Sequence, residues 1–387
     1  MPGLFGRELL GRRLPAILSE YAFGERTCVR EPDGVGMKPR DGQARARLAA
    51  AMLVAVSACG GGPTGPSENN PYQLMSGAAV LSASPIDPEF IRATSPLGML
   101  SPPAHTLPTD HVYITFVDAF SGNQQSDDCS RRPIYAAGGG VVTFVLVTEA
   151  AGDTKVDVQM TPTFHYYYDH VLLLPGITIG TRVTAGQQIA TTTGRCPSFD
   201  IGAYDLDVTL RGLVNPARYG PSTRHAGSPY RYFTEALRSL YLSRSRVFEG
   251  VPTDPDGRID FGVAGRLVGD WFHSSLPVDF NSAGSPNGWS KSIAFAYDWH
   301  NGTPRISVGG TIANPFVGSI GASDPDPGTV SLSNGMVVYG IRLSNASSMH
   351  GWLLVQMTAA DRIRVEFFPA SAPRPTAFTG AAHDYLR

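Results

Sequence analysis

Turn-forming residues interrupt this chain so often that it can hold few long helices. Its 387 residues include 43 glycines and 31 prolines, and the apolar runs between them are short and rich in Val, Ile, Thr, Tyr and Phe. Short runs of these residue types, each ended by turn residues, are typical of β-strands. We therefore expect an all-β fold.

One segment, Tyr232 to Arg246, departs from this pattern because its apolar residues recur at helical spacing. The residues that share its apolar face are Phe233, Leu237, Leu240 and Tyr241. The chain is long enough for two domains by the usual prior of roughly 100 to 200 residues each. We expect a β-barrel-like domain over residues 81–220 and a second β-rich domain, barrel or sandwich, over residues 221–387, with this helix between them.

The expected strands follow the apolar runs. In the first domain they are Val112–Val117, Gly140–Thr148, Thr154–Met160, Phe164–Leu174, Gln188–Thr193 and Tyr204–Leu210. In the second they are Arg258–Val263, Ser292–Asp298, Arg305–Val308, Met336–Leu343, Gly351–Thr358, Ile363–Phe368 and His383–Leu386. Trp271 follows a glycine turn, a position from which an aromatic side chain closes one end of a barrel.

An apolar run near the N-terminus indicates export. Residues 48–58 are uncharged, too few to cross a bilayer, and follow a basic stretch that contains Arg45 and Arg47. The run ends in the sequence VSAC, which resembles the lipobox, where a lipid is attached to the cysteine, here Cys59. We expect an exported lipoprotein, anchored in a membrane through Cys59 and facing the periplasm or the cell surface. The alternative is a plain secretory peptide with a chance cysteine.

The basic stretch also suggests where translation starts. A signal peptide begins within a few residues of its basic stretch, which favours Met37 and makes residues 37–58 the signal peptide. Residues 1–36 are then a mis-assigned extension, or alternatively a genuine disordered one. Residues 59–80 are rich in Gly, Pro, Ser and Asn, so we expect a flexible tether.

The charge of the exported part argues against one class of partner. Removing residues 1–58 takes away nine of the 31 basic and six of the 33 acidic residues, which leaves a net charge of −5. A net negative charge disfavours binding to phosphates. We therefore expect no nucleic-acid partner.

Two of the four cysteines belong to the folded part, Cys129 and Cys196. Exported proteins fold in an oxidising compartment, so we expect a disulfide between them. Two buried free thiols are the alternative.

Four stretches of the first domain follow one another in a distinctive order. They are His105 to Asp110, PIYAAGGGVV from Pro133 to Val142, YDHV from Tyr168 to Val171, and a glycine-rich hairpin from Gly180 to Gly194. Together they resemble the LytM/lysostaphin-type zinc metallopeptidases. The resemblance covers about residues 95–212 and implies a duplicated hybrid motif, a zinc site and a cell-wall peptide as substrate.

The resemblance also implies site residues. His105 and Asp110 stand where the family has a zinc-binding His-x-x-x-Asp pair, although four residues separate them here instead of three. His111 is the alternative metal ligand to Asp110. His170 stands at a family histidine and would act as a general acid or base, or orient a bound water or carbonyl. Its alternative is a satisfied polar residue beside Asp169.

The family's last motif is altered in this chain. Where the family has His-x-His, the chain has Asp205-Leu206-Asp207. Alternate residues of a strand share a face, so we expect Asp207 as a metal ligand and Asp205 as a catalytic group on the same side. A carboxylate in place of an imidazole makes the site harder, so one divalent metal, Zn, Ca, Mg or Mn, would suit it. The alternative is two solvated surface acids.

Three functions follow from these expectations. The missing His-x-His favours a cell-envelope lipoprotein with an incomplete zinc site, which binds peptidoglycan, as cell-wall peptide or glycan, or an envelope partner protein, without cutting it. The second is an active metal-dependent cell-wall peptidase of the LytM/lysostaphin type. The third is a structural envelope spacer. No function is assigned to residues 221–387.

Overall fold

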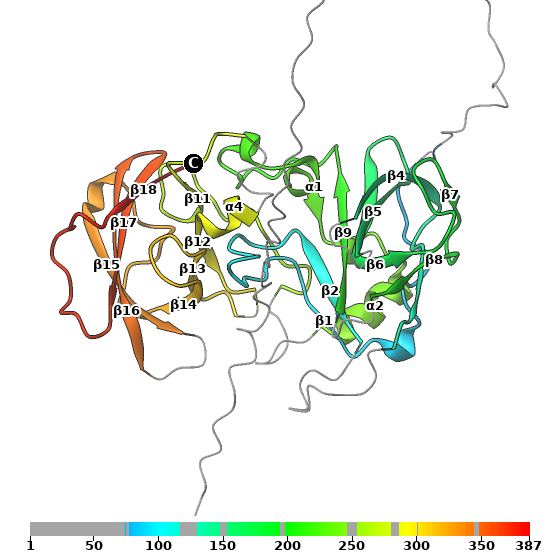
Figure 1. Ribbon diagram of the computed structural model, residues 1–387, viewed down its shortest axis with the longest axis horizontal. Helices are drawn as coiled ribbons and strands as arrows, with labels where there is room; N and C mark the ends of the chain where they lie inside the picture. Colours follow the sequence, from blue (N-terminus) through cyan, green and yellow to red (C-terminus); the bar gives the residue numbers. More distant parts are fainter. Residues whose placement is uncertain are drawn as a thin grey trace, which may run out of the picture. The chain divides into compact units, whose positions relative to one another are not determined.

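A computed structural model describes residue 74 and residues 77–116, 130–147, 153–193, 198–245, 254–279, 286–299, 301–343 and 348–387. The strands in these ranges belong either to a ten-stranded sheet or to a closed barrel (Figure 1). The expected all-β fold class, with a barrel as the second β-rich region, is confirmed. None of the helices in these ranges is long and apolar enough to cross a membrane.

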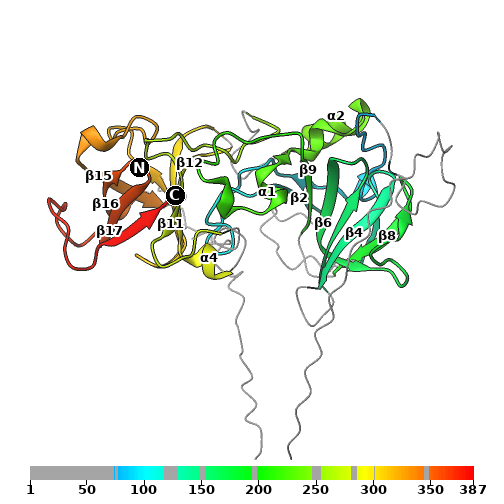
Figure 2. The same ribbon diagram turned by 90° about the horizontal axis from the view of Figure 1, so that it is seen from above.

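The sheet is built from antiparallel neighbours. Its strands are β1 (Ala93–Thr94), β2 (His111–Thr115), β3 (Pro133–Tyr135), β4 (Gly140–Val147), β5 (Thr154–Gln159), β6 (Phe164–Leu173), β7 (Arg182–Val183), β8 (Gln188–Thr192), β9 (Ser198–Asp205) and β10 (Ala226–Gly227). Their order is β1-β2-β9-β6-β5-β4-β7; β8 pairs with β6 and β3, and β10 pairs with β9. Figure 2 shows β2, β9, β6 and β4 in succession.

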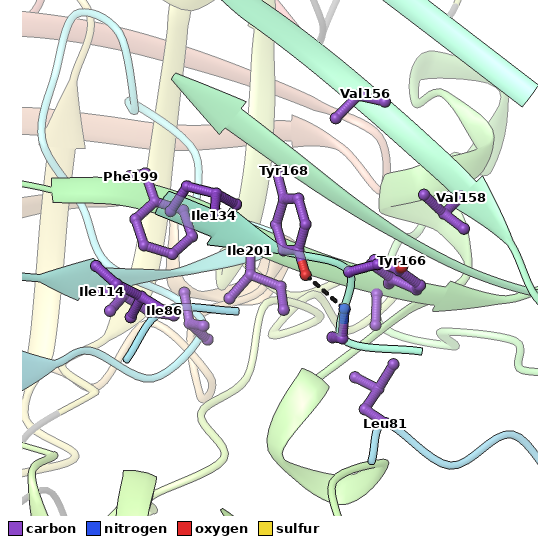
Figure 3. Close-up of a cluster of buried hydrophobic side chains, with 14 of the residues drawn as sticks. Leu81, Ile86, Ile114, Ile134, Val156, Val158, Tyr166, Tyr168, Phe199 and Ile201 are labelled. Atoms are coloured by element: carbon purple, nitrogen blue, oxygen red, sulfur yellow. Dashed lines mark hydrogen bonds between the residues drawn. The ribbon is translucent and has the colours of Figure 1, made fainter. Parts of the chain in front are cut away.

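Alternation of side chains along the strands sets the core on one face of this sheet. Ile114 of β2, Phe199 and Ile201 of β9, Tyr168 of β6 and Val156 of β5 are fully buried together (Figure 3). The hydroxyl of Tyr168 is also satisfied, because it accepts a hydrogen bond from a backbone amide and donates one to a backbone carbonyl. The residues between these positions point to the opposite face.

The expected helix forms, but it is shorter than its apolar spacing suggested. Helix α2 spans Glu235–Ser243 and ends before Arg244. Phe233 and Tyr241 pack in the core of the sheet although they follow residue 220. The other helical segments are short: η1 (Pro88–Phe90), η2 (Pro216–Arg218), α1 (Pro221–Arg224), η3 (Pro229–Arg231), α4 (Pro286–Ser290) and η4 (Leu332–Asn334).

The barrel closes because β11 pairs with both β12 and β18. Its strands are β11 (Gly269–His273), β12 (Ser292–Tyr297), β13 (Pro304–Val308), β14 (Phe316–Ile320), β15 (Met336–Leu343), β16 (Met349–Ala359), β17 (Arg362–Pro369) and β18 (His383–Leu386). Strands β11 and β14 were missing from the sequence-based expectation, and the expected strand Arg258–Val263 does not form. Trp271 lies fully buried in the apolar core of the barrel.

Several sequence predictions concern residues outside the described ranges. They are the extension over residues 1–36, the signal peptide over 37–58, lipidated Cys59, and the disulfide between Cys129 and Cys196.

Candidate functional site

The face of the sheet opposite the core carries a group of acidic and histidine side chains. We call Asp110, His111, Asp153, His170 and Asp200 the polar cluster. His111 begins β2 and Asp110 precedes it. Asp153 directly precedes β5, His170 lies in β6 and Asp200 lies in β9. Strand pairing brings them together, because β9 lies between β2 and β6 and β5 follows β6.

Asp110 holds His111 in one orientation. Asp110 Oδ1 lies 3.0 Å from His111 Nδ1. The same carboxylate accepts hydrogen bonds from the hydroxyls of Tyr167, at 3.1 Å, and Thr223, at 2.5 Å. With Nδ1 engaged, His111 presents Nε2 to Asp200, whose Oδ2 lies 3.5 Å away.

His170 reaches the same face through an irregularity in β6. Two residues of β6, Asp169 and His170, lie opposite one residue of β5, Lys155. Such a bulge re-aims side chains and is frequent beside active sites. His170 has a φ of 61°, which non-glycine residues rarely adopt, and its backbone amide donates a hydrogen bond to Asp169 Oδ1 at 2.9 Å. Strain of this kind persists where the surrounding structure imposes it, commonly at functional sites.

The ring of His170 is held in the same way as that of His111. Its Nδ1 lies 3.0 Å from Asp153 Oδ2, and its Nε2 lies 3.7 Å from Asp200 Oδ2. Both histidines therefore face Asp200 with Nε2 while Nδ1 contacts a second carboxylate. Proteins orient metal-ligating histidines with the same carboxylate–histidine arrangement.

Burial dominates the electrostatics of Asp200. Its side chain is 2% exposed, and burial raises its pKa to about 6 although the positive charges of His111 and His170 act in the other direction. Within the described part of the chain, Asp200 Oδ1 is buried without a hydrogen-bond partner. An unpaired buried carboxylate oxygen is costly unless something compensates it.

The neighbouring charges shift the pKa values of His170, His111 and Asp110 as well. Burial lowers the pKa of His170, but the hydrogen bond with Asp153 and the charge of Asp200 raise it to about 10. Burial also opposes protonation of His111, and Asp200 and Asp110 outweigh it and raise the pKa. Burial opposes ionisation of Asp110 too, yet the contact with His111 holds its pKa below the usual range.

The donor atoms fit a divalent cation with mixed nitrogen and oxygen ligands. Two sets share His170. In one, the ligand atoms of Asp153, Asp169 and His170 lie within 4.8 Å of one another. In the other, His170 and His111 offer Nε2 on either side of Asp200. Among the described residues, only the first set has all its ligand atoms within 4.8 Å of one another. The second set contains both histidines and Asp200, whose Oδ1 has no described hydrogen-bond partner, and we build the proposal below on it.

Four residues singled out by the sequence lie together. His105, Asp110, His111 and His170 belong to or border the polar cluster, since the His105 ring meets the His111 ring edge-on at 5.3 Å between centroids. Burial, reinforced by the charge of His111, lowers the pKa of His105 to about 3. His105 therefore stays neutral at physiological pH.

Asp205 and Asp207 do not lie with them, which corrects the expected geometry. Asp205 is the last residue of β9, five residues beyond Asp200, or about 16 Å along an extended strand. Asp207 follows in a turn, and its backbone amide donates a hydrogen bond to Asp205 Oδ1. The two aspartates therefore do not alternate on one strand.

Asp200 was missed because the last strand of the domain was expected at Tyr204–Leu210, whereas β9 spans Ser198–Asp205. The sequence carried a signal for the correct placement. Phe199, Asp200 and Ile201 alternate apolar and polar residues, as a half-buried strand does.

Comparison with known proteins gives no match to a protein-family model or to a curated protein. Among solved structures, Csd3 from Helicobacter pylori is 17% identical with a TM-score of 0.27, over 43% of this chain and 40% of that one. A zinc containing peptidase from Vibrio cholerae is 20% identical with a TM-score of 0.25, over 33% of this chain and 37% of that one. The chain thus spans about two fifths of the length of each. The solution structure of lysostaphin is 9% identical with a TM-score of 0.24, over 72% and 80% of the two chains.

Proposed function

We propose that the sheet region is a divalent-cation-dependent hydrolase acting on peptide bonds of the bacterial cell wall. The observation that carries the proposal is the arrangement around Asp200. Nε2 atoms of His111 and His170 face this buried carboxylate, and Asp110 and Asp153 hold both imidazole rings. The LytM/lysostaphin-like motifs of the sequence support the substrate class.

In this proposal each residue has a separate task. His111 and His170, each after loss of its Nε2 proton, would hold the cation together with Asp200, and a bound cation would supply Lewis-acid polarisation of a peptide carbonyl and a lowered pKa of water. Asp110 and Asp153 keep the Nδ1 side of each ring occupied, so that Nε2 stays directed at the site. The side chain of His170 is 43% exposed, so substrate can approach from its side. His105 is neutral and lies next to His111, so it can take part in hydrogen bonds at the site without adding a charge.

Metal content and cleavage test this proposal together. Purified chain is dialysed, loaded with zinc or manganese, and assayed on peptidoglycan for newly released amino groups. We expect about one bound metal per chain and metal-dependent cleavage. Both should be lost in Asp200→Asn and kept in Asp207→Asn, the matched control away from the cluster. Retention of metal and activity by Asp200→Asn would overturn the proposal.

A second candidate function is binding of cell-wall peptide or glycan without cleavage. It is favoured by the absence of His-x-His and by the hydroxyl of Tyr113, which lies 3.3 Å from His111 Nε2 and competes for that atom. On this alternative, peptidoglycan sediments the protein equally with and without metal, and no amino groups are released.

Attachment to a membrane through Cys59 belongs to the same proposal, since peptidoglycan lies next to bacterial membranes. The flexible composition of residues 59–80 would let the sheet region reach it. Cys59→Ala should move the protein from the membrane fraction to the soluble fraction. A variant that stays membrane-bound and unprocessed would contradict lipidation at this residue.

A further inference from the structure

The polar cluster lies at one end of two rows of side chains that cross the sheet. Strand pairing places the first row, and its members face away from the core: Tyr113, Asp200, Asp169, Lys155 and Leu146. The second row runs beside it: His111, Gly202, Tyr167, Asp157 and Phe144. Both rows begin on β2 and end on β4.

The β4 end of these rows is apolar and open. Phe144 is 43% exposed and Leu146 is 47% exposed. Val145 between them packs against the core, which confirms that Phe144 and Leu146 share the face of the polar cluster. In the described part of the chain, β7 pairs with β4 only at Gly140 and Val141, so no described strand covers the outer half of β4.

We infer that Phe144 and Leu146 form an apolar subsite for an extended peptide whose cleaved bond lies at Asp200. The inference rests on the proposed function. Along the first row the side chains change from charged ones to the apolar side chain of Leu146. Exposed apolar side chains that adjoin a polar site mark the path of a ligand more often than an isolated apolar residue does. The occupant is therefore a peptide with one apolar side chain some distance from the cleaved bond.

The spacing of the strands gives that distance. Asp200 and Leu146 lie on β9 and β4, three strand intervals apart, or about 14 Å. An extended peptide covers this in about four residues. Lys155, which lies between them in the row, is drawn over the ring of Tyr167 with Nζ 3.8 Å from the ring centroid. Its side chain therefore reaches from the first row over Tyr167 of the second row, and its charge acts on Asp200.

Binding of two matched peptides to the full chain tests the subsite. One is a nine-residue glycine–serine peptide; the other carries leucine at its first and last positions, each four residues from the centre. Fluorescence anisotropy of labelled peptides should show about tenfold tighter binding of the leucine peptide, because one apolar side chain leaves water. Phe144→Ser/Leu146→Ser should reduce this preference to about one. Ile179→Ser, which removes a 62% exposed apolar residue outside both rows, should keep it.

The outcomes separate this inference from the proposed function. Equal binding of the two peptides to the unaltered chain overturns the subsite, whether or not either peptide is cut. Loss of cleavage in Asp200→Asn with the leucine preference retained supports it. If the double variant instead loses affinity for phosphatidylglycerol vesicles and keeps the peptide preference, the apolar residues face a membrane and the subsite is wrong. Leu146→Ala, with an unchanged melting temperature, repeats the test with the smallest change to the fold.

Discussion

The sheet and the barrel both bury charged side chains, but the groups that surround these charges differ between the two regions. In the barrel, buried Arg305 pairs with Asp298, and buried Glu366 accepts hydrogen bonds from the amide and hydroxyl of Thr379. Arg387 donates to backbone carbonyls and lies over the ring of Trp271. Each of these charges has a local partner that explains its burial.

In the sheet the acids outnumber the nearby bases. Asp153, Asp157 and Asp200 are buried on or beside one face, and Asp200 keeps an oxygen without a described partner. Burial raises the pKa of Asp157 and that of Asp200 to about 6, and it does the same to Asp270 in the barrel. The comparison teaches that buried charge alone does not mark a site. What distinguishes the sheet is an excess of one sign with oriented histidines around it.

The largest change in stability among the variants that test this difference between sheet and barrel is expected from Gly202→Ala. A Cβ at Gly202 would overlap the ring of Tyr167, which crosses the glycine to reach Asp110. We expect a loss of about 3 kcal/mol in the free energy of unfolding, since a buried ring must move, together with loss of metal binding. Gly220→Ala is the control, because nothing lies within 4 Å of its added Cβ. Urea unfolding of both variants is the measurement, and equal stabilities would contradict the packing argument.

A bound cation should produce the next largest change in stability. This change should depend on Asp200 in the sheet and not on residues of the barrel. At a free metal concentration of 100 times Kd, binding to the folded state adds about 2.7 kcal/mol to the stability. Differential scanning calorimetry with added zinc or manganese should show the shift in the unaltered chain and not in Asp200→Asn. Asp270→Asn, at a buried acid of the barrel that accepts a hydrogen bond from Tyr219, should keep it. If Asp270→Asn, and not Asp200→Asn, abolished the metal-induced stabilisation, the cation site would lie in the barrel.

Without metal, stability should fall as the pH rises. The folded pKa of Asp200 is above its ordinary value, so its ionisation destabilises the fold from about pH 4 to pH 6. The folded pKa of His170 is also raised, so its stabilising charge is complete below about pH 6.5 and is lost as the pH approaches 10. The partly exposed ring is screened by solvent, and we expect a total of about 2 kcal/mol between pH 5 and pH 9. Melting temperatures across this range measure it, and His170→Gln should flatten the curve.

The smallest effect concerns the backbone of His170. Its φ of 61° suits glycine better than any residue with a Cβ. His170→Gly should therefore be more stable than His170→Ala by about 1 kcal/mol, although both lose the ring. Parallel denaturant titrations decide this, and a more stable alanine variant would show that the left-handed conformation is not retained.

The apolar runs of the sequence predicted several strands. Residues 154–160 and 164–174 were expected as strands and correspond to β5 and β6. Alternation cannot report on a bulge, so nothing in the sequence placed Asp169 and His170 on one face. The short strand β11 follows a turn and joins two distant strands, and such pairing comes from the closed barrel and not from local pattern.

For the site, motif order located three histidines and Asp110, because these lie close to their strands in sequence. Asp200 needed the register of β9 against β2 and β6, which is a property of the assembled sheet. A one-residue error in register moves every side chain to the other face. The sequence prediction placed Asp205 and Asp207 at the family's His-x-His position, whereas the strand register brings Asp200 to the site.

The bulge in β6 has a consequence for how such a site can be gained or lost. Tyr168 pairs with Val156 and Val171 with Thr154, so the strand contains one residue more than regular pairing needs. Deleting His170 would leave a continuous ladder, with Asp169 opposite Lys155 and every downstream residue on its present side. The histidine is thus a removable addition to the scaffold. Evolution or a designer could insert or delete this reactive group in a single codon step without redesigning the core on the other face.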